Sequence, residues 1–461
     1  MPLQKNQVLT LRVERLSSDG SGVAHSPDGE TVFIPGAAPG DEARVRIVKD
    51  CKRYAFGILD EVLTPSPDRI PVDCAVAGPC GGCSLRHLDY AAELRAKQEN
   101  VADAFARIGG LDVPVLPIVG SPEVNRYRNK VQFPVGVDKS GKPCIGFYAG
   151  RTHRIVPCPD CRLQPGVLNE IGNALCAFFA EKGIQPYSEE TGRGLVRHIF
   201  LRRGAHSGQI MVCLVCTCAK LPCAEELCTR LKAQFAEITT ILLNVNAKNT
   251  NVILGTETHT LYGPGYIEDT LCGVPVQLGP LSFYQVNTLA AEQLYGIAAQ
   301  YAQLTPDDLL LDLYCGMGTI GLSMAAHCRE LIGVEIVPEA IESAKANAAR
   351  MGADVAAKSR FFCADAGQAA TRLAAEGLHP DIVMLDPPRK GCDEATLSAV
   401  VRMAPRRVVY VSCNPATAAR DAAWLEQNGY HAEKVQPVDL FPRTRHCECV
   451  LSLSNFPRRE V

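Results

Sequence analysis

Short apolar runs separated by turn residues make up the first 62 residues of the chain. Strands are predicted at residues 7–15, 31–34, 42–49 and 54–62, and turns rich in Gly, Pro and Asp lie between them. This pattern predicts a small five-strand β-barrel of the OB type, a fold that often binds oligonucleotides. The stretch carries eight Lys and Arg against nine Asp and Glu, so its charge adds little support. A packing or dimerisation module is the alternative.

A second region, residues 63–286, begins at a proline-rich joint. A period near 3.6 residues from 90 to 108 predicts a helix. Residues 126–162 contain eight Lys and Arg but two acids, and four more arginines follow at Arg193, Arg197, Arg202 and Arg203. The aromatic residues Tyr127, Phe133, Phe147 and Tyr148 lie among them. Basic and aromatic side chains together suit single-stranded RNA, although a solvated sheet face has a similar composition. We therefore predict a central α+β domain that binds RNA.

Helices and apolar strands alternate from residue 287 to residue 461. Strands are predicted at 308–314, 331–335, 361–363, 381–385 and 407–411, with a clear helix at 338–351. Such alternation predicts an α/β domain with a doubly wound, Rossmann-like parallel sheet. Ligands of such folds bind at the carboxyl ends of the strands, so residues at these ends are the candidates for chemistry.

Composition narrows the class of protein. The 461 residues are 47% apolar and 21% charged, with a net charge of -3, and no apolar run is long enough to cross a membrane. The first ten residues lack the apolar core of a secretion signal, and the 21 cysteines are an odd number. We therefore expect a cytoplasmic protein with free or metal-bound thiols and no complete disulfide framework. The total charge does not indicate a nucleic-acid partner, and no obligate protein partner is evident.

A glycine loop follows the first strand of the α/β domain. The strand ending at Tyr314 runs into Cys-Gly-Met-Gly-Thr at residues 315–319, where Gly316 and Gly318 allow close approach of a ligand to the backbone. A simple tight turn is the alternative. Glu335 ends the second strand and Asp365 follows the third, so both carboxylates should line the same crevice. We predict an adenosine-type ligand, and the two-glycine loop fits S-adenosylmethionine better than a dinucleotide.

The next two strands end in reactive groups. Asp386-Pro-Pro-Arg follows the fourth strand, and the prolines hold the carboxylate at the strand end. Ser-Cys413-Asn-Pro follows the fifth strand and places a thiol at the same edge. A thiolate suits a pyrimidine acceptor, because C5 of uracil becomes nucleophilic after addition at C6. Glu448 is the candidate base for the C5 proton, with a surface carboxylate paired to arginine as the alternative.

Several separated blocks resemble the RNA uracil-C5 methyltransferase family, specifically its 23S ribosomal RNA branch with an N-terminal TRAM domain and an iron-sulfur cluster. The blocks are residues 1–62, 127–130, 282–287, the glycine loop, 386–389, 412–415 and 444–448. The resemblance implies that Cys413 is the nucleophile and Glu448 the base. It also implies that Gln285, Tyr314, Glu335 and Asp386 contact S-adenosylmethionine, and Gly316, Gly318, Thr319 and Asp365 complete the predicted cofactor site.

A cysteine set resembles the four ligands of the family's [4Fe-4S] cluster, namely Cys74, Cys80, Cys83 and Cys161. Spacing alone also allows a structural zinc site formed by Cys80, Cys83, Cys158 and Cys161, which leaves Cys74 spare. We expect iron-sulfur, in a structural or RNA-positioning role, because the methyl transfer moves no net electrons.

The combined prediction is an enzyme that methylates C5 of a uridine in 23S ribosomal RNA, with residues 1–62 as TRAM domain, 63–286 as central RNA-binding domain and 287–461 as catalytic domain. The target base must leave its stack to reach the thiol. Ribosomal RNA is expected because the transfer-RNA branch of the family lacks the TRAM domain and the cluster. Two alternatives stay open, a base-nitrogen methyltransferase and a non-catalytic RNA-binding assembly factor.

Overall fold

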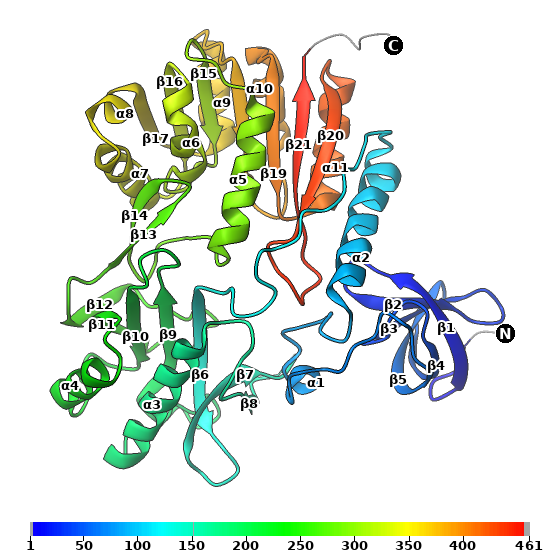
Figure 1. Cartoon of the computed structure of the whole chain (residues 1–461), viewed down its shortest axis with the longest axis vertical. Helices are drawn as coiled ribbons and strands as arrows, with labels where there is room; N and C mark the ends of the chain where they lie inside the picture. The colour runs from blue at the N-terminus through cyan, green and yellow to red at the C-terminus, as the bar shows by residue number, and fades with distance from the viewer. Residues whose placement is uncertain (1–2, 151, 456–461) are drawn as a thin grey trace.

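Three bodies follow one another along the chain in the computed structural model, which describes residues 3–150 and 152–455 (Figure 1). The blue N-terminal barrel lies beside the cyan-to-green central domain, and the α/β domain, running from green to red, lies across both. None of the helices among these residues is long and apolar enough to cross a membrane.

The N-terminal barrel is closed, as the alternating pattern predicts. Its strands are β1 (Val8–Leu16), β2 (Ser21–His25), β3 (Thr31–Pro35), β4 (Glu42–Asp50) and β5 (Tyr54–Thr64), in the order β1-β2-β3-β5-β4. Alternate side chains such as Val32, Ile34 and Val45 are fully buried inside it. Gly57 on β5 allows this packing, because a Cβ atom there would lie 2.3 Å from Cγ1 of Val45.

Asp41 connects the barrel to the segment that leaves it. Its fully buried carboxylate accepts hydrogen bonds from the backbone of Ala38 and Ser66 and from the guanidinium of Arg69, the last at 2.6 and 3.1 Å. Burial by itself raises the pKa of Asp41, but the hydrogen bonds and the charge of Arg69 outweigh it and lower the pKa below its usual value. The carboxylate is therefore ionised at neutral pH and holds the proline-rich joint against the barrel.

The connecting region contains α1 (Ala77–Cys80) and α2 (Tyr90–Asp103), which continues as a π-helical turn (Ala104–Gly109). Val101 and Phe105 of this helix pack into the core of the α/β domain. The helix expected at residues 90–108 is therefore present, and it belongs by packing to the catalytic half of the molecule.

The central domain is a seven-stranded sheet in the order β12-β11-β10-β9-β6-β7-β8. Its strands are β6 (Lys130–Val137), β7 (Pro143–Tyr148), β8 (Ile155–Pro157), β9 (Val196–Arg203), β10 (Ile210–Cys216), β11 (Ile238–Val245) and β12 (Glu257–Tyr262). One face packs on α3 (Gly166–Lys182) and α4 (Ala224–Gln234). The other face, through Phe200, Met211 and Leu242, shares a core with the α/β domain.

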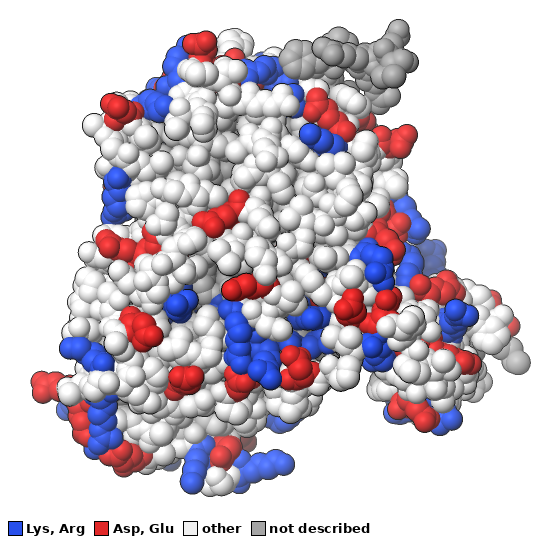
Figure 2. All heavy atoms as spheres, viewed as in Figure 1, with Lys and Arg blue, Asp and Glu red and all other residues white. Residues whose placement is uncertain are grey.

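Part of the basic and aromatic pattern of this domain has a structural explanation. Tyr127 and Phe133 are buried, at 5% and 0% exposure, so they are not available for stacking on bases. Arg197 donates hydrogen bonds to the carbonyls of residues 246 and 248, and Arg202 to those of residues 279 and 282. The interpretation of these four residues as an RNA surface is wrong, because Phe133, Arg197 and Arg202 point inward from their strands and Tyr127, which precedes β6, is buried as well. Other Lys and Arg side chains do gather near the middle of the face shown in Figure 2.

The α/β domain has the strand order β17-β16-β15-β18-β19-β21-β20. Its strands are β15 (Leu309–Leu313), β16 (Glu330–Glu335), β17 (Ser359–Cys363), β18 (Ile382–Leu385), β19 (Arg407–Ser412), β20 (His431–Val438) and β21 (Glu448–Ser454). The predicted parallel strands are confirmed, but β21 runs antiparallel between β19 and β20. The connection from β20 to β21, residues 439–447, is too short for a crossover helix, so the strand must return antiparallel.

Helices cover both faces of this sheet. One layer contains α5 (Thr288–Ala302), α6 (Thr319–Met324) and α7 (Pro338–Arg350), with α8 (Ala353–Lys358) beside α7, and it packs with the hairpin of β13 (Ile267–Leu271) and β14 (Val274–Leu278). The other layer contains α9 (Ala366–Ala375), α10 (Glu394–Met403) and α11 (Pro415–Gln427). The carboxyl edge of the sheet lies between these layers and the central domain.

We expect Asp41→Asn to destabilise the barrel by about 2–4 kcal/mol, because it removes a buried charge and leaves the Arg69 guanidinium without its partner. Hydrogen exchange of β1 to β5 in urea measures this locally. The difference should shrink in acid, since protonation of Asp41 as the pH falls through its lowered pKa removes the same charge. Asp60→Asn, at an exposed pair with Arg46, is the control and should change little. Equal effects of the two substitutions would contradict the assignment.

Candidate active site

The glycine loop between β15 and α6 bends through left-handed conformations. Gly316 has φ of 56° and Gly318 has φ of 80°, and the preceding Tyr314 also has a positive φ of 66°. A Cβ atom on Gly318 would lie 3.1 Å from both Ala344 and Leu322. The loop therefore needs glycine at this position, both for its backbone and for its close packing on α7.

Glu335, at the end of β16, is fixed beside this loop. Its Oε2 accepts from the amide of Gly316 at 3.1 Å, and its Oε1 accepts from the amides of Ile336 and Val337 at 2.9 and 3.0 Å. Ile336 and Val337 are 61% and 45% exposed, which is unusual for such side chains. A rigid carboxylate next to two exposed apolar side chains fits the ribose hydroxyls and adenine ring of an adenosine-type ligand.

Two further acids are protonated more readily than usual at this edge. Burial raises the pKa of Asp386, after β18, to about 7 and that of Asp312, in β15, to about 8. The value for Asp312 includes the charges of Asp386 and Glu335, which also raise its pKa, and the hydrogen bond from the amide of Gly321, which lowers it. Oδ1 of Asp312 is buried without a hydrogen-bond partner in the described part of the chain. These carboxyl groups would favour a cationic ligand, and S-adenosylmethionine carries a sulfonium charge.

The remaining predicted cofactor residues have different local surroundings. Thr319 begins α6, and Gln285 lies just before α5, where its carbonyl accepts from the side chain of Asn129 at 2.7 Å. Asp365 caps α9 by accepting from the amide of Gln368 at 3.1 Å. The hydroxyl of Tyr314 lies 3.3 Å from that of Thr396 on α10. Asp365 and the Tyr314 hydroxyl thus already have structural partners.

Tyr295 is a site residue that the sequence did not reveal. It is buried on α5, and burial and the nearby Asp386 raise its pKa, while side-chain hydrogen bonds with Thr319 and Gln285 lower it. It therefore connects three of the predicted cofactor residues. Its sequence surroundings are those of an ordinary apolar helix, so no local signal distinguishes it.

Cys413 and Glu448 face each other across two neighbouring strands. Ser412 in β19 pairs with Cys449 in β21, so the next residues in the antiparallel register are Cys413 and Glu448. Cys413 is partly exposed, whereas Glu448 is 7% exposed. The hydroxyl of Ser412 accepts from the amide of Asn414 at 3.1 Å and fixes the turn that presents the thiol.

The two groups influence each other's protonation. The pKa of Glu448 is raised to about 8, mainly by burial and also by the charge of Asp386, whereas the charge of Arg389 lowers it. Burial also raises the pKa of Cys413, together with the charges of Glu448 and Asp386, and Arg389 opposes this through its charge and a hydrogen bond. The carbonyl of Arg389 accepts from Asn414 and Thr417 at 3.0 and 3.3 Å, which ties the two loops together. Arg389 is thus a second site residue whose role the sequence did not indicate.

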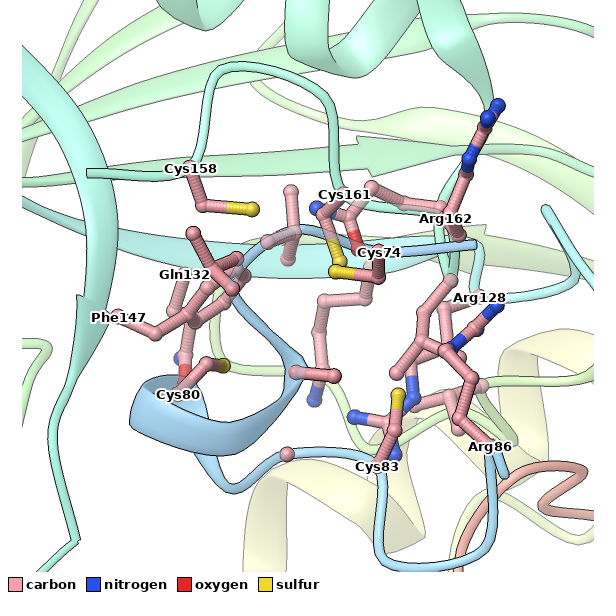
Figure 3. Close-up of a pocket in the computed structure, with 18 residues that line it drawn as sticks. Cys74, Cys80, Cys83, Arg86, Arg128, Gln132, Phe147, Cys158, Cys161 and Arg162 are labelled. Carbon is pink, nitrogen blue, oxygen red and sulfur yellow. The ribbon is translucent and has the colours of Figure 1, made fainter. Parts of the chain in front are cut away.

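A separate cavity of about 280 Å³ collects the predicted metal ligands (Figure 3). Cys74, Cys80, Cys83, Cys158 and Cys161 all line it, from the α1 segment on one side and the segment after β8 on the other. Four basic side chains also line it, namely Arg86, Arg128, Lys130 and Arg162. Buried nitrogen atoms of Arg86 and Arg128 have no hydrogen-bond partner among residues 3–150 and 152–455. The positive charge of these side chains therefore suits a cavity whose cysteines are thiolates or hold an anionic group.

The cysteine side chains around this cavity do not converge on one point. In the parts of the chain that the structure describes, no three His, Cys, Asp or Glu side chains are placed to hold a single metal ion. A zinc ion requires four ligands close around one point, whereas the atoms of an iron-sulfur cluster spread its thiolates further apart. The described cysteines are therefore not arranged around a single ion.

Comparison with known proteins agrees with this geometry. The family model described as tRNA (Uracil-5-)-methyltransferase matches residues 277–456, and that of the TRAM domain matches residues 2–59. An uncharacterized RNA methyltransferase of Halalkalibacterium halodurans is 43% identical over 457 residues, covering 98% of this chain and 99% of its own. The chain belongs to the RNA uracil-5-methyltransferase family. An uncharacterized RNA methyltransferase of Listeria monocytogenes is 42% identical to the enzyme over 455 residues, with 98% of both chains covered.

A solved structure resembles the whole methyltransferase. The tRNA (uracil-54, C5)-methyltransferase of Pyrococcus abyssi, in complex with S-adenosyl-L-homocysteine, has a TM-score of 0.76 and 26% identity, covering 97% of this chain and 100% of its own. The match includes the barrel, so an enzyme that acts on transfer RNA shares the full architecture. The presence of a TRAM domain therefore does not by itself separate ribosomal from transfer RNA as substrate.

We expect Glu448→Gln to speed alkylation of Cys413 by iodoacetamide about threefold or more at about pH 9, but to change it little at about pH 7. At the lower pH the Glu448 carboxyl is mostly protonated because its pKa is about 8, so the substitution removes no charge. At the higher pH it removes a carboxylate that raises the pKa of the thiol. Peptide mass spectrometry resolves Cys413 from the other cysteines, and Glu342→Gln on the exposed surface is the control. Acceleration at both pH values, or at neither, would contradict this coupling.

Proposed function

We propose that the enzyme methylates C5 of a uridine in 23S ribosomal RNA through a covalent adduct with Cys413. The observation that carries this proposal is the placement of Cys413 opposite Glu448 across β19 and β21, beside Asp386 and the glycine loop. A nucleophile and a base at the edge of one cofactor crevice are what C5 methylation of uracil requires.

The steps assign one task to each side chain. The Cys413 thiolate adds to C6 of the flipped uracil, which gives an enolate with a nucleophilic C5. S-adenosylmethionine supplies the electrophilic methyl group. Glu448 then removes the C5 proton, the electron pair forms the C5–C6 double bond, and the C6–S bond breaks to release the thiolate. A base with a pKa near 8 is suited to this proton transfer at physiological pH.

Arg389 supports the first step. Its positive charge lowers the pKa of both Cys413 and Glu448, so it favours the thiolate over the thiol and the carboxylate over the acid. Because burial and the neighbouring acids act in the opposite direction, the thiolate is a minor species in the free enzyme. Uracil is uncharged, so its binding adds no charge that would stabilise the thiolate. Arg389 therefore stays the charge that favours the Cys413 thiolate.

The choice of 23S ribosomal RNA rests on the sequence resemblance to that branch and on the cysteine cavity. We propose that the cavity holds a [4Fe-4S] cluster on Cys74, Cys80, Cys83 and Cys161, with the basic side chains balancing its charge. Cys158 lies in the same cavity as a fifth cysteine. The role of the cluster is structural, since no electron enters or leaves the methyl transfer.

Incubation with RNA that carries 5-fluorouridine tests the reaction. Fluorine cannot leave C5 as a proton does, so we expect a denaturation-stable adduct whose RNA is attached to Cys413, and none with Cys413→Ala. Cys363→Ser, at an exposed cysteine of the same sheet edge, is the control and should trap normally. Fragments of 23S ribosomal RNA and transfer RNA transcripts, tested side by side, decide the substrate.

Three outcomes would overturn parts of the proposal. Methylation without any adduct would favour the base-nitrogen methyltransferase. Binding of RNA without binding of S-adenosylmethionine would favour the assembly factor. Adducts with transfer RNA but not with ribosomal RNA would keep the chemistry and replace the substrate.

Single cysteine substitutions distinguish the two metal assignments. We expect anaerobically purified Cys74→Ser to lose most of its iron, acid-labile sulfide and visible absorption, whereas Cys158→Ser retains them. A zinc site would show the reverse, because Cys74 would be the spare residue and Cys158 a ligand. Metal analysis of the two purified variants measures this directly.

A further inference from the structure

The segment that leads to Glu448 is anchored outside the sheet that carries the base. Residues 439–447 connect β20 to β21. Val438 and Glu448, which flank this segment, pair with each other in the antiparallel register of the two strands. Its first residue, Asp439, is fully buried. How this segment is held therefore decides where the Glu448 side chain lies.

A buried group of three charges holds it. The ammonium of Lys97 lies 2.7 Å from Oε1 of Glu93 and 2.8 Å from Oδ1 of Asp439. Lys97 is 2% exposed, and both acids are 0% exposed. Burial alone would lower the pKa of Lys97, but the two carboxylates outweigh it and raise the pKa, so the lysine is charged.

The same three side chains also bind the backbone of the segment. Lys97 donates to the carbonyl of Phe441 at 3.2 Å, and Glu93 accepts from the amide of Arg443 at 2.7 Å. Asp439 accepts from the amide of Phe441 at 3.0 Å and, through its other oxygen, from Tyr90 at 3.0 Å. The charges are thus connected to three backbone atoms of the segment, two in Phe441 and one in Arg443.

Other parts of the molecule meet the same segment. The hydroxyl of Tyr127, from the central domain, donates to the carbonyl of Pro442 at 2.9 Å. The amide of Leu85, just after Cys83, donates to the carbonyl of Arg443 at 3.1 Å. A Cβ atom on Gly20 of the barrel would lie 3.3 Å from Arg445. The barrel, the cysteine segment and the central domain therefore all contact the approach to the base, with Lys97 at its buried centre.

We propose that Lys97 is a positioning residue for Glu448, acting through Asp439 and the backbone of residues 441–443. The inference rests on the proposed function, since it concerns the base of that reaction. Without the ammonium, the buried Asp439 carboxylate loses its ion pair and Glu93 keeps only the longer one with Arg443 at 3.6 Å, so the segment must shift or a carboxylate must take up a proton. The step most sensitive to such a shift is removal of the C5 proton, because general-base catalysis depends on geometry.

The test measures the covalent intermediate on ordinary uridine RNA. We expect Lys97→Met to slow the elimination roughly 10- to 100-fold relative to addition, so that a denaturation-stable adduct of methylated RNA with Cys413 accumulates in a single turnover. A residue with a merely structural role would lower all steps together and build up no adduct. Arg95 is on the same helix as Lys97 and forms an exposed ion pair with Asp68. Arg95→Met is therefore the matched control and should leave the adduct level unchanged.

Two further variants make the outcome decisive. If Lys97→Met does not fold, the combination of Glu93→Gln, Lys97→Met and Asp439→Asn removes the same ammonium without leaving the two carboxylates unpaired. Glu448→Gln should accumulate the adduct by itself, and if it does not, the proposed base is wrong. If Glu448→Gln accumulates the adduct but neither Lys97 variant does, the positioning role is wrong while the proposed function stands.

Discussion

The loss of water around carboxyl groups at one edge of the parallel sheet is the constraint on which the site depends. Because β15, β16, β18 and β19 are parallel, their carboxyl ends meet, and Asp312, Glu335 and Asp386 are brought together with no salt bridge to any residue that the structure describes. The antiparallel β21 adds Glu448 to this group. The raised pKa values of Asp312, Asp386 and Glu448 make the edge receptive to a cation.

A continuous core makes this edge rigid. Phe200, Met211 and Leu242 of the central sheet pack in one cluster with residues of α5 and of the glycine loop, so the central domain is part of the wall behind the cofactor crevice. Helix α2 closes the opposite layer through Val101 and Phe105. The domains that are expected to hold RNA are therefore in direct contact with the groups that carry out the chemistry, and a change in one is transmitted through packing.

Local patterns were sufficient for much of the fold. Alternating apolar residues identified the barrel, and apolar runs identified the strands before the glycine loop and before Cys413. Both signals depend only on residues that are neighbours in the sequence. The meeting of Cys413 with Glu448 depends on the pairing of β19 with β21, which no local pattern encodes. Side-chain direction explains why Phe133 and Arg202 were misinterpreted, since an inward and an outward strand residue look alike in sequence. Arg389 and Tyr295 act through contacts that only the assembled sheet creates.

The anchoring of the last strand pair has a consequence for the order in which the protein matures. Glu93 and Asp439, which bind the same lysine, are far apart in the chain, and the contact of Lys97 with Asp439 spans 342 positions. During synthesis the lysine leaves the ribosome long before its second partner exists, so its charge stays hydrated until the C-terminal residues arrive. The strand pair that carries Glu448 is therefore completed last. A nascent chain that already has its barrel and cysteine cavity can meet RNA before it can modify it.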